Sequence, residues 1–297
     1  MSALIHSLEE SIEDIREIVD RAKDPITDDW DPLLLGLSIA KLEYENLDVQ
    51  KSLEDFNRAI EGPLKEFPKD ADLQEQTAFI SKVFSVDLGF QGDSTNYYNV
   101  KNSFLSDVLV RRKGIPLTLS LVYMSLARAA GLNAVGIAFP GHFLVRPLSE
   151  KRRPAQDHWQ KQWFVDPFEQ GKIITVEDCR ERLQTWTRNV IPFGPEALRV
   201  AHPTDIISRM LRNLRAIYAE KEELPRLYWV LTALIELCPL DRLDSLKERG
   251  FLFARMSRFR AAIKDLKEFL DQVPNPGDYD HVEQMLRYFE LQQELMN

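Results

Sequence analysis

The sequence contains few cysteines and no long hydrophobic segment. Only two of its 297 residues are cysteine, and Cys179 and Cys238 lie too far apart to suggest a disulfide framework or a metal site. No segment approaches the ~18 consecutive apolar residues of a membrane-spanning helix, and the first residues lack the basic and apolar regions of a signal peptide. We therefore expect a soluble protein of the reducing cytoplasm, with no membrane partner.

Basic residues are also too few for a general nucleic-acid-binding protein. The 38 lysines and arginines are outnumbered by 47 acidic residues, so the net charge is −9, whereas nucleic-acid binding requires a basic face. The sequence contains no motif for a metal or a cofactor, and neither is expected. Its 44% hydrophobic residues can fill a sizeable core in one or two domains.

The first hundred residues have the pattern of a helical layer. Apolar residues recur every three or four positions, which predicts amphipathic helices in four segments: 8–19, 32–39, 49–60 and 71–84. A loop rich in glycine and small polar residues follows, and it contains Tyr97 and Tyr98. These tyrosines are candidates for lining a cleft, although a half-buried cover over the core is the simpler interpretation.

The densest part of the sequence, residues 102–146, alternates helix and strand signals. Asn102 is a candidate N-cap of one helix and a further candidate cleft residue. Pro116 supplies the fixed φ angle that suits the first turn of a second helix. Apolar and β-branched residues then predict strands over 134–139 and 142–145, separated by a Pro-Gly turn.

This order of elements resembles the core of transglutaminase-like and papain-like cysteine enzymes, in which a histidine heads one strand and an aspartate ends the next. The segments GHFLVR and WFVDPF supply these residues as His142 and Asp166. The segments NSFLSDVLVRRKGIPLTLSLVY and FPGHFLVR are similar to the SirB-type bacterial family, which joins a transglutaminase-like module to tetratricopeptide repeats. The resemblance implies a nucleophilic cysteine at the start of the second helix, where this sequence has Pro116.

The strand alternation predicts how the histidine and the aspartate meet. If residues 162–166 pair antiparallel with the strand that begins at His142, then Arg146 lies opposite Gln162 and His142 lies opposite Asp166. Directly opposed side chains are roughly 5 Å apart at Cβ, close enough for a carboxylate to orient an imidazole. A polar contact without any catalytic role is an equally good interpretation of this pair.

Two classes of function follow from these residues. The first is a non-catalytic interaction, scaffolding or regulatory protein. The nucleophilic cysteine is missing, and general acid–base groups alone would contribute only about 10²–10⁴-fold to a rate. The second is a hydrolase or acyl transferase that uses His142 and Asp166 with an unconventional nucleophile. Ser120 is the candidate for that nucleophile, since it lies one turn beyond Pro116, although a helix-interior hydroxyl is usually bonded to a carbonyl one turn back.

Beyond a proline-rich joint, the sequence changes to helical hairpins. Five residues fall at the offsets of the tetratricopeptide pattern, namely Gly250, Phe253, Ala262, Leu266 and Pro274. The sequence thus predicts an α+β fold: a helical N-terminal layer, a transglutaminase/papain-like core with a small antiparallel sheet, and tetratricopeptide-like hairpins. We expect domains at 1–195, with the core at about 100–195, and at 203–297, whose surface would bind a protein or peptide partner.

Overall fold

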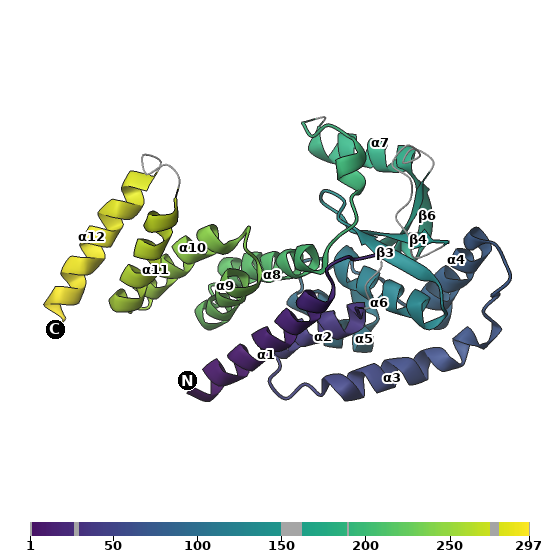
Figure 1. Cartoon of the computed structure of the whole chain (residues 1–297), viewed down its shortest axis with the longest axis horizontal. Coiled ribbons are helices and arrows are strands. Elements are labelled where there is room, and N and C mark those ends of the chain that lie inside the picture. The colour runs from purple at the N-terminus through teal and green to yellow at the C-terminus, as the bar shows by residue number, and fades with distance from the viewer. Residues whose placement is uncertain (1, 27–29, 150–161, 189, 274–278, 297) are drawn as a thin grey trace. The chain divides into compact units, whose positions relative to one another are not determined.

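The computed structural model describes residues 2–26, 30–149, 162–188, 190–273 and 279–296. The chain forms two compact units that divide between residues 206 and 207. Helices predominate and the sheets are small (Figure 1), so the predicted α+β class is confirmed. The domain limits at 195 and 203 remain a proposal.

The N-terminal residues form helices, as their periodicity predicts: α1 (Ser2–Arg21), α2 (Pro32–Lys41), α3 (Val49–Glu61) and α4 (Leu73–Lys82), with short helical turns η1 (Pro63–Glu66) and η2 (Val83–Asp87). Two aspartates fix where α2 and α4 begin. Asp31 accepts a hydrogen bond from Leu33 N at 2.8 Å, and Asp72 accepts one from Glu75 N at 2.8 Å. Such caps satisfy backbone donors that the first helical turn leaves without partners.

The buried helix α6 (Pro116–Ala129) is the centre of the first unit. Every residue from Pro116 to Ala127 is buried, as expected for a helix that is covered on all sides. Before it come the short elements β1 (Gln91–Gly92), η3 (Val100–Asn102), α5 (Leu105–Arg111) and β2 (Lys113–Gly114). Strands β1 and β2 pair in parallel, which ties the tyrosine-containing loop to the start of α6.

The sheet lies against α6 and consists of four antiparallel strands in sequential order: β3 (Asn133–Ile137), β4 (Leu144–Leu148), β5 (Trp163–Asp166) and β6 (Lys172–Thr175). Helix α6 packs on β3 and β4. The other face of the sheet packs on α7 (Val176–Thr187) and on the turn η6 (Pro195–Leu198) through a shared apolar cluster. Figure 1 shows the sheet between α6 and α7.

The predicted strand limits and register need correction. Strand β3 ends at Ile137, and β4 begins at Leu144, so His142 lies in the turn before β4 instead of heading it. Strands β4 and β5 pair with Val145 opposite Val165, which shifts the predicted register by two residues. Strand β4 begins later than predicted because the chain from Phe139 to His142 forms a tight turn, in which His142 N donates to Phe139 O at 3.1 Å. A shift of two keeps every side chain on its predicted face, because side chains alternate with period two.

The second unit is helical. Helix α8 (Pro203–Glu220) crosses the division between the units, and it is followed by α9 (Leu224–Leu237), α10 (Arg242–Arg255), α11 (Phe259–Gln272) and α12 (Asp280–Leu295). A Cβ atom added to Gly250 would lie 2.7 Å from the Leu266 side chain. This is the close packing of α10 on α11 that the predicted repeat requires, and Ala262 and Leu266 are fully buried there. The predicted marker Pro274 lies outside the described residues.

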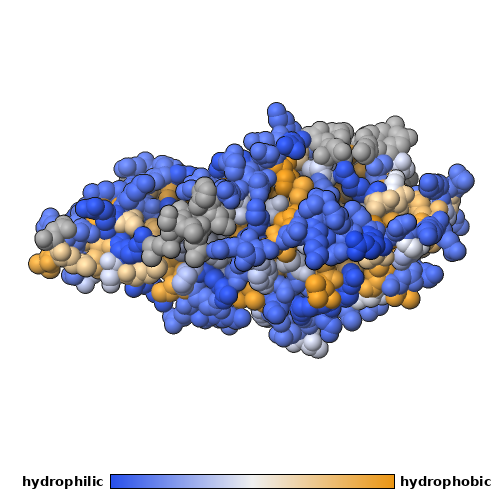
Figure 2. Space-filling model, turned by 90° about the horizontal axis from the view of Figure 1, so that it is seen from below, coloured by the Kyte–Doolittle hydropathy of each residue, from blue (hydrophilic) through white to orange (hydrophobic). Residues whose placement is uncertain are grey.

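The face of the molecule seen in Figure 2 is largely hydrophilic, and its apolar areas are separate and limited. Among the described residues, no helix is both long enough and apolar enough to cross a membrane.

Candidate functional site

Asp166 is the best-connected side chain at the candidate site. It ends β5 and is fully buried. Its carboxylate accepts hydrogen bonds from His142 Nε2 at 2.9 and 3.0 Å, from Arg182 Nη1 at 2.7 Å, and from the backbone N–H of Phe168 and Glu169 at 3.1 and 3.4 Å. The two backbone bonds cap η5 (Pro167–Glu169). The predicted contact between His142 and Asp166 is therefore present.

Burial and hydrogen bonding act in opposite directions on this carboxyl. Burial raises the pKa of Asp166, but the hydrogen bond and charge of His142 lower it, as do those of Arg182, and the net result is a pKa below the usual value for aspartate. A carboxylate that is ionised when buried must be paired and hydrogen-bonded. Asp166 therefore carries a negative charge that holds both His142 and Arg182 in place.

His142 is enclosed by aromatic rings. Its side chain is 10% exposed. The ring centres of Phe168 and Trp186 lie 6.1 and 5.7 Å from the imidazole, and Tyr97 contacts Phe168 in turn at 6.1 Å. Trp186 and Tyr98 are 49% and 75% exposed, so apolar ring surface reaches solvent close to this buried pair.

Three residues of the site were not predicted from the sequence: Phe168, Arg182 and Trp186. Phe168 follows Asp166 by two positions in WFVDPF, so its proximity could have been inferred from the turn that Pro167 starts. Arg182 and Trp186 are four positions apart on α7 and therefore share one face of that helix. Nothing in the local sequence indicates which face of the sheet α7 covers.

Asn102 holds the tyrosine-containing loop in place and does not cap a helix. It is fully buried, its side chain donates to Asn96 O at 2.8 Å, and it accepts from Arg111 Nη1 at 2.8 Å. Helix α5 has Phe104 at its N-cap instead, so the predicted cap is wrong. The amide group of Asn102 is used to fix the loop, whereas Tyr97 and Tyr98 remain candidates for a binding surface.

Among the hydrogen bonds of the described residues, none joins Ser120 to the imidazole. It is fully buried, and its Oγ donates to Phe143 O at 3.4 Å. This acceptor lies on the chain next to His142, and it replaces the carbonyl one turn back that the sequence predicts as the usual partner. Pro116 is buried at the first position of α6, directly after the N-cap residue Ile115.

Both cysteines are buried and neither forms a disulfide. Burial raises the pKa of Cys179 to about 12 and that of Cys238 to about 12. Within the part of the chain that the structure describes, no group of three or more His, Cys, Asp or Glu side chains could hold a metal ion.

We expect neither cysteine to react as an activated nucleophile. Only the thiolate is alkylated, and a raised pKa keeps the thiolate population small near neutral pH. Iodoacetamide should therefore modify Cys179 and Cys238 slowly in the folded protein between pH 6 and 9, and at an ordinary thiol rate in urea. A folded-state rate that titrates well below the free-cysteine pKa of roughly 8.5 would contradict this prediction.

A buried histidine–aspartate pair at the strand ends of a small antiparallel sheet that packs on a central helix, followed by helical hairpins, is typical of a transglutaminase-like module with a repeat module. Comparison with known proteins agrees with this class. Residues 47–212 match the transglutaminase-like superfamily, and residues 214–287 match a tetratricopeptide repeat family. The chain belongs to the transglutaminase-like superfamily, and its predicted combination with tetratricopeptide repeats is confirmed.

Two bacterial proteins are similar to this chain over most of their length, and a human protein is similar over a smaller part. A UPF0162 protein of Xylella fastidiosa strain Temecula1 is 29% identical over 272 residues, covering 86% of this chain and 89% of that protein. A UPF0162 protein of Vibrio cholerae is 26% identical over 235 residues, covering 79% and 81%. Human F-box only protein 21 is 29% identical over 150 residues, which are 50% of this chain and 23% of that protein. The bacterial relatives agree with the resemblance to the SirB-type family.

Proposed function

We propose that this protein is a non-catalytic interaction protein, with scaffolding or regulatory function, in which a transglutaminase-like module supports partner binding by the tetratricopeptide repeats. The observation that carries the proposal is the absence of a nucleophile at the imidazole. Among the described residues, no thiol or hydroxyl donates to His142, whose Nε2 is bonded to Asp166. The hydroxyl of Ser120 is bonded to Phe143 O, and the thiols of both cysteines are buried.

On this proposal, Pro116 occupies the position that a nucleophilic cysteine has in active relatives. Pro116 lies at the first turn of α6, where the partial positive charge of a helix N-terminus would stabilise a thiolate. A proline has no nucleophilic atom and no backbone N–H. The site would then be a structural remnant in which Asp166 connects β5, α7 and the turn before β4.

The repeat module offers a surface for a protein or peptide partner. On α12, Tyr288, Leu291 and Leu295 are exposed at spacings of three and four, so they share one face of the helix. Neighbouring apolar side chains on one exposed helical face are typical of interaction surfaces. Two buried, unpaired cysteines suit the cytoplasm that we propose as the location.

A hydrolase or acyl transferase is the alternative proposal. It is supported by the orientation of His142, whose Nε2 faces Asp166 and leaves Nδ1 for a second partner. A carboxylate likewise orients the general base of a serine-protease triad, although there it bonds to Nδ1 and leaves Nε2 for the nucleophile. The alternative requires a nucleophile that the described residues do not bring to the imidazole.

The substitution Pro116→Cys tests the proposed position of the missing nucleophile. On the proposed alignment, a cysteine there would lie at a helix N-terminus and near the His142 imidazole, so its thiol should have a pKa below the ordinary value of roughly 8.5. We expect iodoacetamide to alkylate this variant rapidly at pH 6–7, whereas Ser120→Cys, which remains buried, should react slowly. The rates would be measured against pH by mass spectrometry of the intact chain.

Two sets of controls test separately whether Pro116 is at the nucleophile's position and whether the protein lacks activity. Adding His142→Ala to Pro116→Cys should return the thiol to an ordinary pKa, and an unchanged pKa would show that Pro116 is not the nucleophile's position. Wild-type protein and His142→Ala should give equal, background rates with p-nitrophenyl acetate and with peptide amides. Turnover by the wild type that is lost in His142→Ala would favour the hydrolase.

A further inference from the structure

Only part of the outer edge of β3 is paired. This strand lies at one end of the sheet, and residues 199–201 run along its outer side, where Val200 bridges Ile137. Two backbone hydrogen bonds join them: Ala138 N to Arg199 O at 3.1 Å and Ala201 N to Gly136 O at 2.8 Å. The chain then leaves the edge, because α8 begins at Pro203. The first half of β3 therefore extends beyond residues 199–201, its neighbour on the outer side.

The backbone of Ala134 points outward from the sheet at this edge. In an antiparallel ladder, residues that bond to one neighbouring strand alternate with residues that bond to the other. Gly136 and Ala138 bond outward, so Ala134, two residues earlier, presents its N–H and C=O in the same direction. No described backbone group pairs with Ala134 on that side. The edge thus offers one N–H donor and one C=O acceptor, both of Ala134, placed as the pairing of an added β-strand requires.

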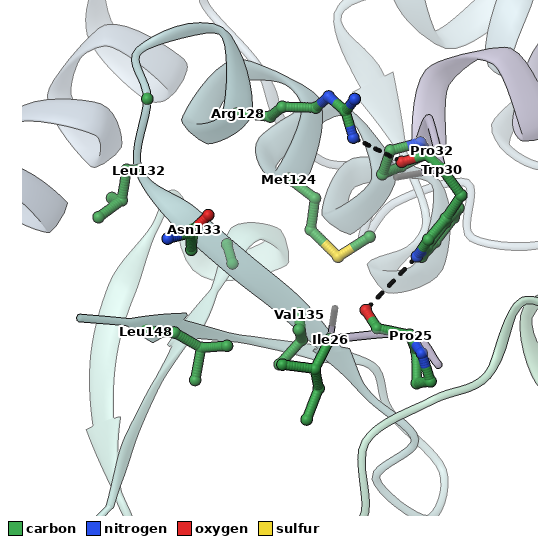
Figure 3. Close-up of a pocket in the computed structure, with 12 residues that line it drawn as sticks. Pro25, Ile26, Trp30, Pro32, Met124, Arg128, Leu132, Asn133, Val135 and Leu148 are labelled. Carbon is green, nitrogen blue, oxygen red and sulfur yellow. Dashed lines mark hydrogen bonds between the residues drawn. The ribbon is translucent and has the colours of Figure 1, made fainter. Parts of the chain in front are cut away.

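A cavity of about 320 Å³ lies beside Ala134. Figure 3 shows Met124 of α6 on one side of it and Ile26, Val135 and Leu148 on the other, with Trp30 closing one end. The indole N–H of Trp30 donates to Pro25 O at 3.4 Å, so the apolar part of the ring faces the cavity region. This volume is at the lower end of the range of ligand sites, roughly 300–1,000 Å³.

Asn133 adds a polar group to this apolar site. Its side chain lines the cavity and is half-buried. Its cross-strand neighbour on β4 is the apolar Leu148, and none of the described residues forms a hydrogen bond with its amide. A carboxamide can both donate and accept, which matches the two groups of a peptide bond.

We propose that the Asn133–Val135 edge of β3, together with this cavity, binds a short extended peptide. The peptide backbone would pair with the N–H and C=O of Ala134, in line with the existing pairing of residues 199–201. One apolar side chain of the peptide would enter the cavity, and Asn133 would bond to the next peptide group. Strand addition of this kind obtains affinity from backbone hydrogen bonds and specificity from a side-chain pocket. The site is at the opposite end of β3 from the turn that carries His142, and it is independent of the proposed function.

Five pentapeptides would test this site, each acetylated and amidated with two threonines on either side of a central Ala, Val, Leu, Met or Phe. They would be titrated into the ¹⁵N-labelled full chain while the Ala134 amide and the Trp30 indole signals are followed by NMR. We expect saturable shifts of both signals with the large apolar central residues, and weaker binding with alanine. N-methylation of the peptide group that faces Ala134 should weaken binding about tenfold, the factor for one lost hydrogen bond.

Protein variants provide the matched comparison. Asn133→Ala should weaken binding about tenfold and leave folding intact, while Asn57→Ala, on the exposed side of α3, should bind as the wild type does. Ala134→Pro removes the outward donor at an edge position that tolerates proline, and it should abolish binding.

Three results would overturn the proposal. The first is that no peptide gives saturable shifts at millimolar concentration. The second is that parent and N-methylated peptides bind equally, which would indicate an apolar ligand without strand pairing. The third is that the Ala134 amide becomes protected with increasing protein concentration alone, which would indicate a second copy of the chain at this edge.

Discussion

Replacing Asp166 with asparagine is expected to lower the free energy of unfolding by about 3–5 kcal/mol, the usual cost of removing one partner from a buried charge pair. An asparagine cannot accept from Arg182 Nη1, His142 Nε2 and two backbone N–H groups as the carboxylate does. Arg182 is only 17% exposed, so its guanidinium would lose its main partner without full hydration. Urea unfolding at pH 7 would measure the change.

Glu169→Gln is the matched control for Asp166→Asn. Glu169 also accepts from Arg182, at 2.9 Å, but it is 44% exposed, and exposed ion pairs contribute about 0–1 kcal/mol. We therefore expect a change below ~1 kcal/mol for this variant. Equal effects of the two substitutions would show that Asp166 does not hold the site together.

The same pair of proteins has a defined pH dependence. The folded pKa of Asp166 is lowered, so its contribution to stability is fully present above the unfolded aspartate pKa of roughly 3.9 and is lost as the pH falls through the folded pKa. The difference in unfolding free energy between wild type and Asp166→Asn should therefore be constant near neutral pH and should shrink below about pH 4. A difference that grows on acidification would contradict this assignment.

Gly92→Ala is expected to destabilise the protein by about 1–3 kcal/mol, the usual cost of overpacking. A Cβ at this position would lie 2.7 Å from both the Phe168 ring and the Phe168 carbonyl oxygen. The ring could rotate away, but the carbonyl belongs to η5, whose backbone is fixed by the Asp166 cap. The substitution should therefore also shift the NMR signals of the His142 ring, which lies against Phe168.

Gly62→Ala provides the comparison. A Cβ at Gly62 would meet nothing within 4 Å, and its φ and ψ of −63° and −58° suit any residue. This variant should be neutral or stabilised by about 0.4–1 kcal/mol, because alanine restricts the unfolded chain. The prediction for Gly92 fails if both glycine variants unfold at the same urea concentration as the wild type.

The features that could be predicted best from the sequence are those that a residue and its near neighbours determine. Helical periodicity located α1 to α4, and Pro116 marked the start of α6, because these signals act within a few residues of the chain. The pairing of His142 with Asp166 could also be predicted, since alternation fixes the face of a strand. The register was off by two residues, because alternation fixes only the face on which a side chain lies, and a shift of two positions leaves that face unchanged.

Contacts over long sequence distances could not be predicted in this way. Arg182 reaches Asp166 only because α7 lies on one particular face of the sheet, and no local pattern determines that choice. Asn102 is of a residue type that often caps helices, but in the folded chain its side chain bonds to Arg111 and to the backbone of Asn96. The sequence indicates that Asn102 forms a local polar contact, but it does not indicate which groups Asn102 bonds to.

The sequential order of the sheet also has a consequence for aggregation. A sheet with its strands in the order β3-β4-β5-β6 has two edges, and an unpaired edge can add strands from other molecules. Strand β6 has only four residues, begins with the exposed Lys172, and runs directly into α7, whose N-cap Thr175 exchanges hydrogen bonds with Asp178. These features block pairing at that edge. The first half of β3 has no such charge, so it is the edge at which partly unfolded molecules would begin to associate.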